Sequence, residues 1–488
     1  MTWILLAALA VALGSPVDDW NDLIREGAGL VAQGRYQDAE RKYREALQLA
    51  ERAPASDRLA ATLNNLAQTL RLEGKFAESE PLSLHAIAAW ENIHGPNHPS
   101  LAPALTNLAR LYGLRGRYAE AEALYRRALD ILERTDPIDS ELPATVNNLG
   151  TLYFHQGRYA EAERAFVRAL TLLEQASPLG DRRLAATLMN LGNLHRAQGR
   201  LQEAESYLRR AEPILVREFH AGHPEFGVYY NALGLVCLVQ GRVSEARNHL
   251  QQALSIRESA FGPNHPDVAV TLSNLAEVYL TIGEFRRAEA LQRRTLAIDR
   301  KRADSGRLAE ALTLSNLGAI VASQERFPEA EQMLRQALAI LETQSGSENP
   351  QLEATLNDLG AVLRAGHRYE EAEGLHQRAL KLAEQAWGTE HPEVATSLAH
   401  LAELYRQTSR PRLAEPLYQQ ALRIREKVFG SDHPLVAYLL NSYAVLLRQE
   451  HRKREAAQIE ERSRAILAHH ERDNALGQTV EWMALRKK

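Results

Sequence analysis

The chain has 488 residues, of which 45% are hydrophobic and 25% are charged, and these proportions are ordinary for a soluble globular protein. The formal net charge of −4 provides no general attraction to nucleic acid or to an anionic membrane surface. The single cysteine, Cys237, excludes an internal disulfide framework and a cysteine-rich metal site.

The N-terminal segment differs in composition from the rest of the chain. Residues 3–13 (WILLAALAVAL) form an uncharged apolar run, long enough for the core of a signal peptide and too short to span a bilayer. The small residues Ala12 and Gly14 suit cleavage after Gly14, although no Lys or Arg precedes the run. We expect residues 1–14 to be a signal peptide, and the mature protein to be periplasmic or secreted and not inserted in the membrane. The alternative is a hydrophobic first helix in a cytoplasmic protein.

From about residue 20 to 468 the sequence repeats with a period of 42 residues. An asparagine marks the period, and one step of 41 separates its second and third members. The column consists of Asn65, Asn107, Asn148, Asn190, Asn274 and Asn316, and it continues as Asp358, His400 and Ser442. A fixed period between 20 and 50 residues indicates a stacked repeat architecture. We therefore predict one array in which each unit packs on its neighbours.

Residues 105–133 illustrate one repeat unit. The first part predicts a helix with a single apolar stripe, made of Leu105, Leu108, Ala109 and Tyr112. Gly116 follows, and glycine is the usual residue where a helix ends in a left-handed turn. The second part predicts another helix with the apolar stripe Ala121, Leu124, Tyr125, Ala128 and Leu129. The unit is thus a pair of antiparallel helices.

Further signals locate the ends of the helices along the chain. The second helices are predicted to begin near Tyr36, Phe76, Tyr118, Tyr159, Leu201, Val243, Phe285, Phe327, Tyr369, Pro411 and Lys453. The linkers 94–102, 261–269, 387–395 and 429–437 share a glycine followed by a His-Pro pair. Proline suits the first position of a helix and pushes the residue before it out of the α region. A first helix is therefore expected to begin near each of these prolines.

The pattern resembles the tetratricopeptide repeat, in the 42-residue form found in kinesin light chains and in many bacterial repeat proteins. The residues that carry the likeness in one unit are Leu108, Ala109, Tyr112, Gly116, Tyr118, Ala121, Tyr125 and Ala128, together with the His-Pro linker. The resemblance implies an all-α solenoid of about 11 antiparallel helix pairs that form a right-handed superhelix, with first helices on the concave side. Residues 469–488 fall outside the repeat as a C-terminal cap or tail, where Trp482 and Met483 are expected to dock.

If the first helices line a groove, helical spacing places the asparagine column on its surface. Each amide offers two donors and one acceptor, so the six asparagines could hold the backbone of an extended peptide. The alternative is that they cap or bridge neighbouring helices. Leu235 and Leu238, with Val228, Ala232 and Val239, make the middle of the predicted groove apolar, and exposed apolar surface rimmed by charge often marks an interaction site.

Six residues after the asparagine column, three consecutive units carry Arg364, Arg406 and Arg448. A stripe of arginines could pair with carboxylates, and the alternative is that these are solvated surface residues. Together with the apolar middle, the stripe predicts a protein or peptide partner that is acidic or amphipathic.

The sequence lacks the motifs of the common catalytic sites. It has no G-x-x-x-x-G-K-[ST], no G-x-S-x-G and no H-E-x-x-H, which would indicate phosphate binding, an esterase nucleophile or a zinc protease. The histidines of the linkers lie a repeat apart and cannot converge on one metal ion, and Cys237 falls in the buried Tyr112 column. We therefore predict a non-enzymatic scaffold without metal or cofactor. The alternative is an accessory or regulatory subunit of an enzyme or secretion complex that uses its convex face or end caps.

Overall fold

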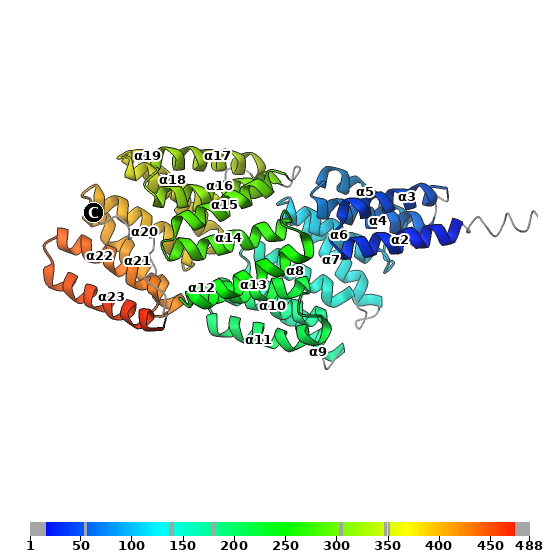
Figure 1. The fold of residues 1–488 in the computed structure, drawn as a ribbon, viewed down its shortest axis with the longest axis horizontal. Coiled ribbons are helices and arrows are strands. Elements are labelled where there is room, and N and C mark those ends of the chain that lie inside the picture. The colour runs from blue at the N-terminus through cyan, green and yellow to red at the C-terminus, as the bar shows by residue number, and fades with distance from the viewer. Residues whose placement is uncertain are drawn as a thin grey trace, which may run out of the picture. The chain divides into compact units, whose positions relative to one another are not determined.

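The computed structural model describes residues 16–52, 56–135, 141–176, 181–301, 306–345, 349 and 352–473. These residues form 22 α-helices and no β-strand (Figure 1). The first helices of the pairs are α2 (Pro16–Ala32), α4 (Asp57–Glu73), α6 (Leu101–Leu114), α8 (Glu141–His155), α10 (Arg182–Ala197), α12 (Pro224–Val239), α14 (Pro266–Thr281), α16 (Gly306–Ser323), α18 (Leu352–Ala365), α20 (Pro392–Gln407) and α22 (Pro434–Gln449). The second helices are α3 (Tyr36–Ala50), α5 (Phe76–His94), α7 (Tyr118–Thr135), α9 (Tyr159–Ala176), α11 (Leu201–Glu218), α13 (Val243–Phe261), α15 (Phe285–Asp299), α17 (Phe327–Ser345), α19 (Tyr369–Trp387), α21 (Pro411–Phe429) and α23 (Lys453–Asp473).

All the second helices begin at the residue that the repeat predicted. The turn before each of them explains this regularity. Gly116 has φ +73°, a left-handed conformation that glycine adopts without steric cost. At the equivalent position of the last four pairs, Glu325, His367, Ser409 and His451 have φ between 55° and 63°. The turn is therefore fixed by the packing of the pair, even where the local residue disfavours it.

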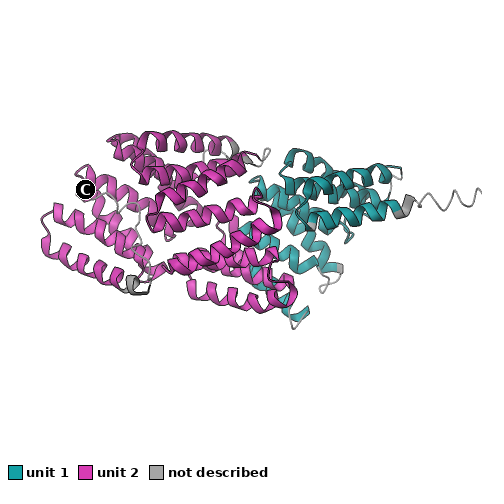
Figure 2. Ribbon diagram, in the orientation of Figure 1, with its two compact units in different colours: residues 1–153, 164–178, 302–305 teal, residues 154–163, 179–301, 306–488 magenta. Residues whose placement is uncertain are grey.

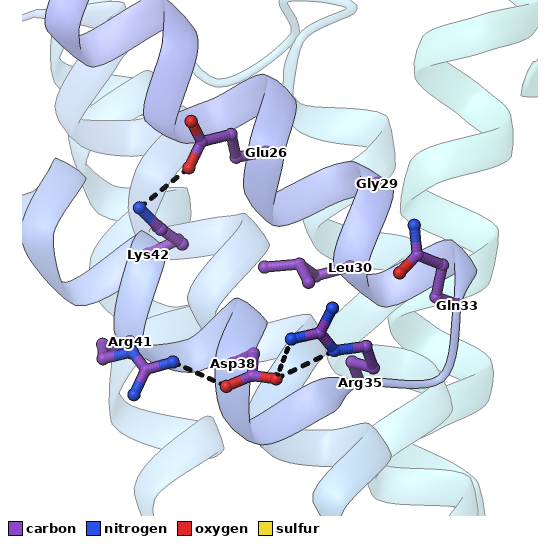
Figure 3. A pocket seen from close by; sticks show the side chains of 8 residues that line it. All are labelled: Glu26, Gly29, Leu30, Gln33, Arg35, Asp38, Arg41 and Lys42. Carbon is purple, nitrogen blue, oxygen red and sulfur yellow. Dashed lines mark hydrogen bonds and ion pairs between the residues drawn. The ribbon is translucent and has the colours of Figure 1, made fainter.

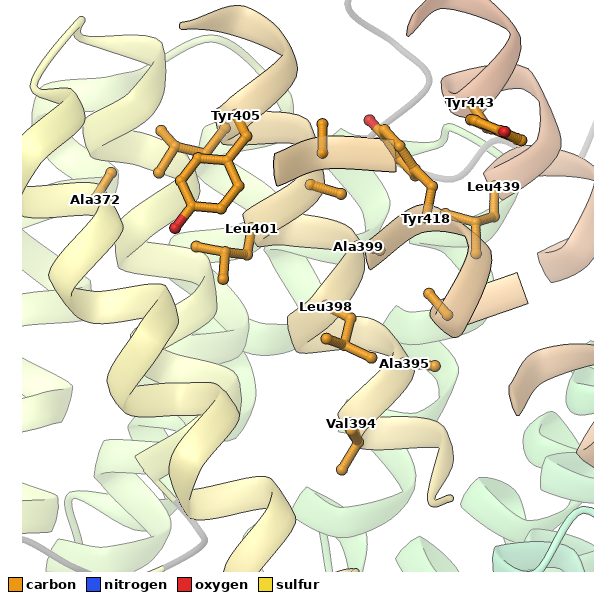
Figure 4. Close-up of a cluster of buried hydrophobic side chains, with 14 of the residues drawn as sticks. Ala372, Val394, Ala395, Leu398, Ala399, Leu401, Tyr405, Tyr418, Leu439 and Tyr443 are labelled. Atoms are coloured by element: carbon orange, nitrogen blue, oxygen red, sulfur yellow. The ribbon is translucent and has the colours of Figure 1, made fainter. Parts of the chain in front are cut away.

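Small residues let the two helices of a pair approach closely. Ala121 and Ala128 on α7 are fully buried, as are the alanines in the same columns of other pairs, among them Ala246, Ala253 and Ala372. Between pairs, the first helices touch one another, as α12 does with both α10 and α14. Larger side chains such as Leu398, Tyr405 and Tyr418 fill the remaining space (Figure 4).

The His-Pro linkers have a defined role in this architecture. The Nδ1 atom of His265 accepts a hydrogen bond from the backbone N–H of Asp267 at 3.2 Å, while Pro266 occupies the first helical position. The ring of His265 also stacks on Phe261 at the end of the preceding helix, with ring centroids 4.4 Å apart. His223, His391 and His433 cap α12, α20 and α22 in the same way. In the linker 94–102 the helix begins at Leu101, two residues after the proline.

The chain divides into two compact units (Figure 2). Unit 1 comprises residues 1–153, 164–178 and 302–305, and unit 2 comprises residues 154–163, 179–301 and 306–488. The boundary passes through α8 and α9. Residues 1–15 and 474–488, which contain the predicted signal peptide and the predicted docking residues Trp482 and Met483, lie outside the described residues. A single continuous array from 20 to 468 stays a prediction.

Candidate protein-binding face

The asparagine column lies on the first helices, and two of its members bridge neighbouring pairs. Asn107 donates from Nδ2 to Oδ1 of Asn64 at 3.0 Å, and Asn274 donates in the same way to Asn231 at 2.9 Å. Both acceptors belong to the first helix of the preceding pair. The bridging role considered from the sequence is therefore present in each of the two compact units. Each donor amide keeps an oxygen and one N–H for further contacts.

The other members of the column differ in exposure. Asn65, Asn148 and Asn190 are half-buried, and Asn316 on α16 is exposed. In contrast, His400 is buried where an asparagine would stand. Peptide binding by the column stays a prediction.

The three arginines of the predicted stripe have different surroundings. Arg364 is only 3% exposed, and its Nη1 lies 3.4 Å from Oε1 of Glu403. Arg406 donates to both oxygens of Glu403, at 2.8 and 2.6 Å. Arg448 is exposed and pairs with Glu460 at 2.6 Å. Two of the three positive charges are therefore shared with one carboxylate that the protein itself supplies.

Glu403 is the residue that sequence reasoning missed at this place. It lies three residues before Arg406 on α20, a spacing at which side chains on a helix meet, and it also accepts a hydrogen bond from the hydroxyl of Tyr418 at 2.8 Å. Burial raises the pKa of Glu403, but the hydrogen bond from Arg406 and the charge of Arg364 outweigh it and hold the pKa below its usual range. The carboxylate is therefore charged at neutral pH.

A strip of exposed aliphatic side chains crosses three consecutive first helices of unit 2. Val228 on α12, Val270 on α14 and Leu312 on α16 are 37%, 51% and 41% exposed, and each lies 42 residues from the next. We call these three residues the aliphatic strip. The sequence reasoning included Val228 but missed Val270 and Leu312, although the 42-residue spacing places all three in one column. Leu235 and Leu238, predicted to be in the groove, are half-buried on α12.

Polar side chains follow the aliphatic strip along the same helix faces. On α14, Asn274 and the exposed Glu277 lie four and seven residues after Val270, a spacing that keeps all three on one face. Glu277 is exposed to solvent. Desolvation by the surrounding protein nevertheless raises the pKa of its carboxyl, and the positive charge of Arg196 only partly offsets this effect. The aliphatic strip thus has amide and acidic neighbours.

An open pocket at the first helix pair has no catalytic arrangement. It is lined by Glu26, Leu30, Asp38, Arg41, Lys42 and their neighbours (Figure 3). Lys42 pairs with Glu26 at 2.8 Å, and Asp38 pairs with both Arg35 and Arg41 at 2.6 Å (Figure 3). Both carboxylates of the pocket are therefore paired with basic side chains of the protein itself, and the pocket offers no nucleophile next to a base.

Cys237, Glu245 and His249 bring three possible metal-ligating atoms within 4.8 Å of one another. Arg242, however, holds both oxygens of Glu245 at 2.8 and 2.5 Å, a clasp that recurs in other pairs, as between Arg117 and Glu120. Cys237 is fully buried, and burial raises the pKa of its thiol to about 11. The thiol is therefore protonated at neutral pH, in keeping with the predicted core position of Cys237.

Comparison with known proteins agrees with the repeated helix pairs of the structure. A family model described as tetratricopeptide repeat matches residues 23–80, 58–134, 141–215, 225–301, 351–427 and 393–468, and a second model of the same description matches 311–351. Together the matches cover most of the chain. No curated protein matches it. No helix in the described ranges is long and apolar enough to cross a membrane.

One solved structure shares the fold of this chain over most of its length. A Rap protein complexed with competence and sporulation factor is 15% identical, and the alignment covers 77% of this chain and 100% of that one with a TM-score of 0.58. The nearly identical TPR-like repeats of a putative kinesin light chain from Podosopora anserina are 25% identical over 43% of this chain and 99% of theirs, with a TM-score of 0.34. The first likeness establishes an all-α helical-repeat solenoid.

Proposed function

Because the chain belongs to the tetratricopeptide repeat family, whose members are protein–protein interaction scaffolds, we propose that it is a non-enzymatic scaffold that binds a segment of a partner protein across the first helices of unit 2. The aliphatic strip carries this proposal. Three aliphatic side chains at the same position of three consecutive pairs expose surface that water solvates poorly, and a partner would cover it.

The chemistry around the aliphatic strip defines the partner segment. Apolar side chains of the segment would lie on Val228, Val270 and Leu312, while its backbone would meet the amides of Asn274 and Asn316. We propose an amphipathic segment with acidic residues toward the exposed Arg448. Arg364 and Arg406 contribute less attraction to such acids than two free arginines would, since both pair with Glu403 and Arg364 is buried. The complex of the Rap protein with its factor supports a binding role by analogy of fold.

The proposal is tested by substituting the aliphatic strip. The full chain on beads is compared with the triple variant Val228→Asn, Val270→Asn and Leu312→Asn, and captured proteins are identified by mass spectrometry. A control triple variant, Val167→Asn, Val216→Asn and Leu413→Asn, changes exposed aliphatic residues of second helices by the same chemistry.

We expect the partner to be retained by the wild type and the control and lost from the strip variant. Loss from the control with retention by the strip variant would instead indicate an accessory subunit that binds through its second helices, and the proposed face would be wrong.

We also propose that the protein is exported, on the basis of the apolar run at residues 3–13. N-terminal sequencing of the protein from its native cells tests this proposal. A mature terminus at Ser15 is expected, and an intact Met1 in the cytoplasm would contradict it.

A further inference from the structure

The Glu403 site of unit 2 has a counterpart seven repeats earlier in unit 1. The 42-residue columns relate Arg364 on α18 to Arg71 on α4, and Tyr418 on α21 to Tyr125 on α7. Glu403, which lies between them on α20, corresponds to Arg110 on α6. The carboxylate that completes the site in unit 2 is therefore replaced by a second arginine in unit 1.

Arg71 is buried without a partner for its charge. Its side chain is 7% exposed, and its Nε and Nη2 atoms have no hydrogen-bond partner among the described residues. Burial, and then the positive charge of Arg110, lower the pKa of Arg71 to about 9. The other groups that act on it are the hydroxyls of Tyr125 and Tyr36. A buried guanidinium that lacks a counter-charge is costly for a folded protein.

The same columns show one further difference between the two sites. Arg406, which donates to Glu403 in unit 2, corresponds to Gly113 in unit 1, so the second arginine that holds the carboxylate in unit 2 is missing there. The neighbouring side chain at Gly113 is the apolar Leu152, whose Cδ1 would lie 3.2 Å from a Cβ at that position. Gly113 is half-exposed and Arg110 is exposed. The side of the site formed by Arg110 and Gly113 therefore faces solvent at least in part.

We propose that Arg71 and Arg110 form an anion site that takes a carboxylate of a partner protein, at the position that Glu403 fills in unit 2. The inference rests on the proposed function in that the partner is a protein segment lying on first helices. A carboxylate fits because its planar pair of oxygens matches the fork of a guanidinium. The counterpart in unit 2 also holds a carboxylate, that of Glu403, next to Arg364 and Tyr418, the equivalents of Arg71 and Tyr125.

The substitution Arg110→Glu tests the inference by supplying the missing carboxylate within the chain. Arg110 is exposed, so the change does not disturb the core. Arg110→Gln removes the repulsion without adding a carboxylate, and Arg164→Glu makes the same change of charge at another exposed position of unit 1. For each full-length protein, the thermal unfolding temperature and the binding of labelled hexaglutamate and hexaglutamine peptides are measured. Inorganic phosphate serves as a second anion.

We expect hexaglutamate, but not hexaglutamine, to bind the wild type and the Arg164→Glu variant. Binding should weaken about ten- to hundredfold in Arg110→Glu, as for the loss of charge-assisted hydrogen bonds. Arg110→Glu should also unfold at a higher temperature than the wild type, with Arg110→Gln between them. Equal hexaglutamate binding by all the variants, or a lower unfolding temperature for Arg110→Glu, would overturn the inference.

Stabilisation of the wild type by phosphate without hexaglutamate binding would overturn the choice of a carboxylate ligand. The strip variant could lose partner capture while Arg110→Glu binds hexaglutamate and unfolds as the wild type does. That result would support the proposed function and refute this inference.

Discussion

His433 donates a hydrogen bond from Nε2 to the backbone carbonyl of Val239, 2.6 Å away and 194 residues earlier in the chain. The direction of the bond follows from the other ring nitrogen. Nδ1 of His433 accepts from the backbone N–H of Leu435 at 3.1 Å, so in the neutral ring the proton belongs to Nε2. A linker histidine thus joins two distant parts of unit 2 while it caps α22.

His433→Ala is expected to destabilise the protein more than His265→Ala does. Both substitutions remove a helix cap and an aromatic stack, as His265 caps α14 and lies on Phe261, and a cap is worth about 1 kcal/mol. Only His433→Ala also loses the bond to Val239, which adds about 1 kcal/mol. Urea unfolding of the two variants measures the difference, and equal losses would show that the distant bond contributes nothing to stability.

Gly157 and Gly283 offer a second matched comparison within unit 2. Both have a left-handed backbone, with φ +70° and +76°, so alanine costs about 1–2 kcal/mol at either position. A Cβ at Gly157 would lie 2.5 Å from Cδ1 of Trp387, whereas a Cβ at Gly283 would meet nothing within 4 Å. We expect Gly157→Ala to cost roughly 1–3 kcal/mol more than Gly283→Ala because of overpacking. Indistinguishable thermal unfolding of the two variants would show that Trp387 moves aside freely.

The sequence predicted the helix pairs well because their signals are local. The apolar stripes, the buried alanines and the turn at Gly116 depend on residues close together in the chain, and these set the start of each second helix. Contacts between distant repeats, such as that of Gly157 with Trp387, depend on small rotations between successive pairs that add up along the array. Contacts of this kind therefore cannot be predicted from the residues of one repeat.

The candidate site was predicted less completely, and Arg364 shows why. Its column predicted the position on a first helix, but not that the side chain would turn toward Glu403 of the next pair and be buried. A long side chain has many rotamers, and the one adopted depends on charges brought close by folding. The exposure of Val270 and Leu312 likewise depends on what covers each helix face, which a column of similar residues does not reveal.

Glu403→Gln is expected to destabilise the protein by about 3–5 kcal/mol, since it leaves the buried Arg364 without its counter-charge. Glu415→Gln is the control. Glu415 accepts hydrogen bonds from Arg452 and Tyr443, but the Glu415 and Arg452 side chains are 30% and 35% exposed, and such a pair is worth less than about 1 kcal/mol. Urea unfolding at pH 7 compares the two variants, and a loss as small as that of the control would contradict the buried role of Glu403.

The buried carboxyl of Glu353 on α18 predicts that the stability of the protein falls as the pH rises. Its carboxyl is buried and accepts hydrogen bonds from Asn357 and Ser397, both at 2.6 Å. Burial, and then the nearby carboxyl groups of Glu393 and Asp358, raise the pKa of Glu353 to about 8. An acid whose pKa is raised by folding binds its proton more tightly in the folded state. Its contribution to stability is complete below the unfolded pKa of 4.5 and is lost as the pH rises through 8.

Glu353→Gln should remove this dependence, because glutamine is neutral at every pH and keeps an oxygen that can accept both hydrogen bonds. Between about pH 4.5 and 8, the free energy of unfolding of the wild type should fall relative to the variant by at most about 1.4 kcal/mol per pH unit. Glu370→Gln, at an exposed position of α19, should follow the wild type. Urea unfolding at pH 5, 6, 7 and 8 provides the measurement. Parallel curves for the wild type and Glu353→Gln would mean that Glu353 ionises in the folded protein as readily as it does in the unfolded chain.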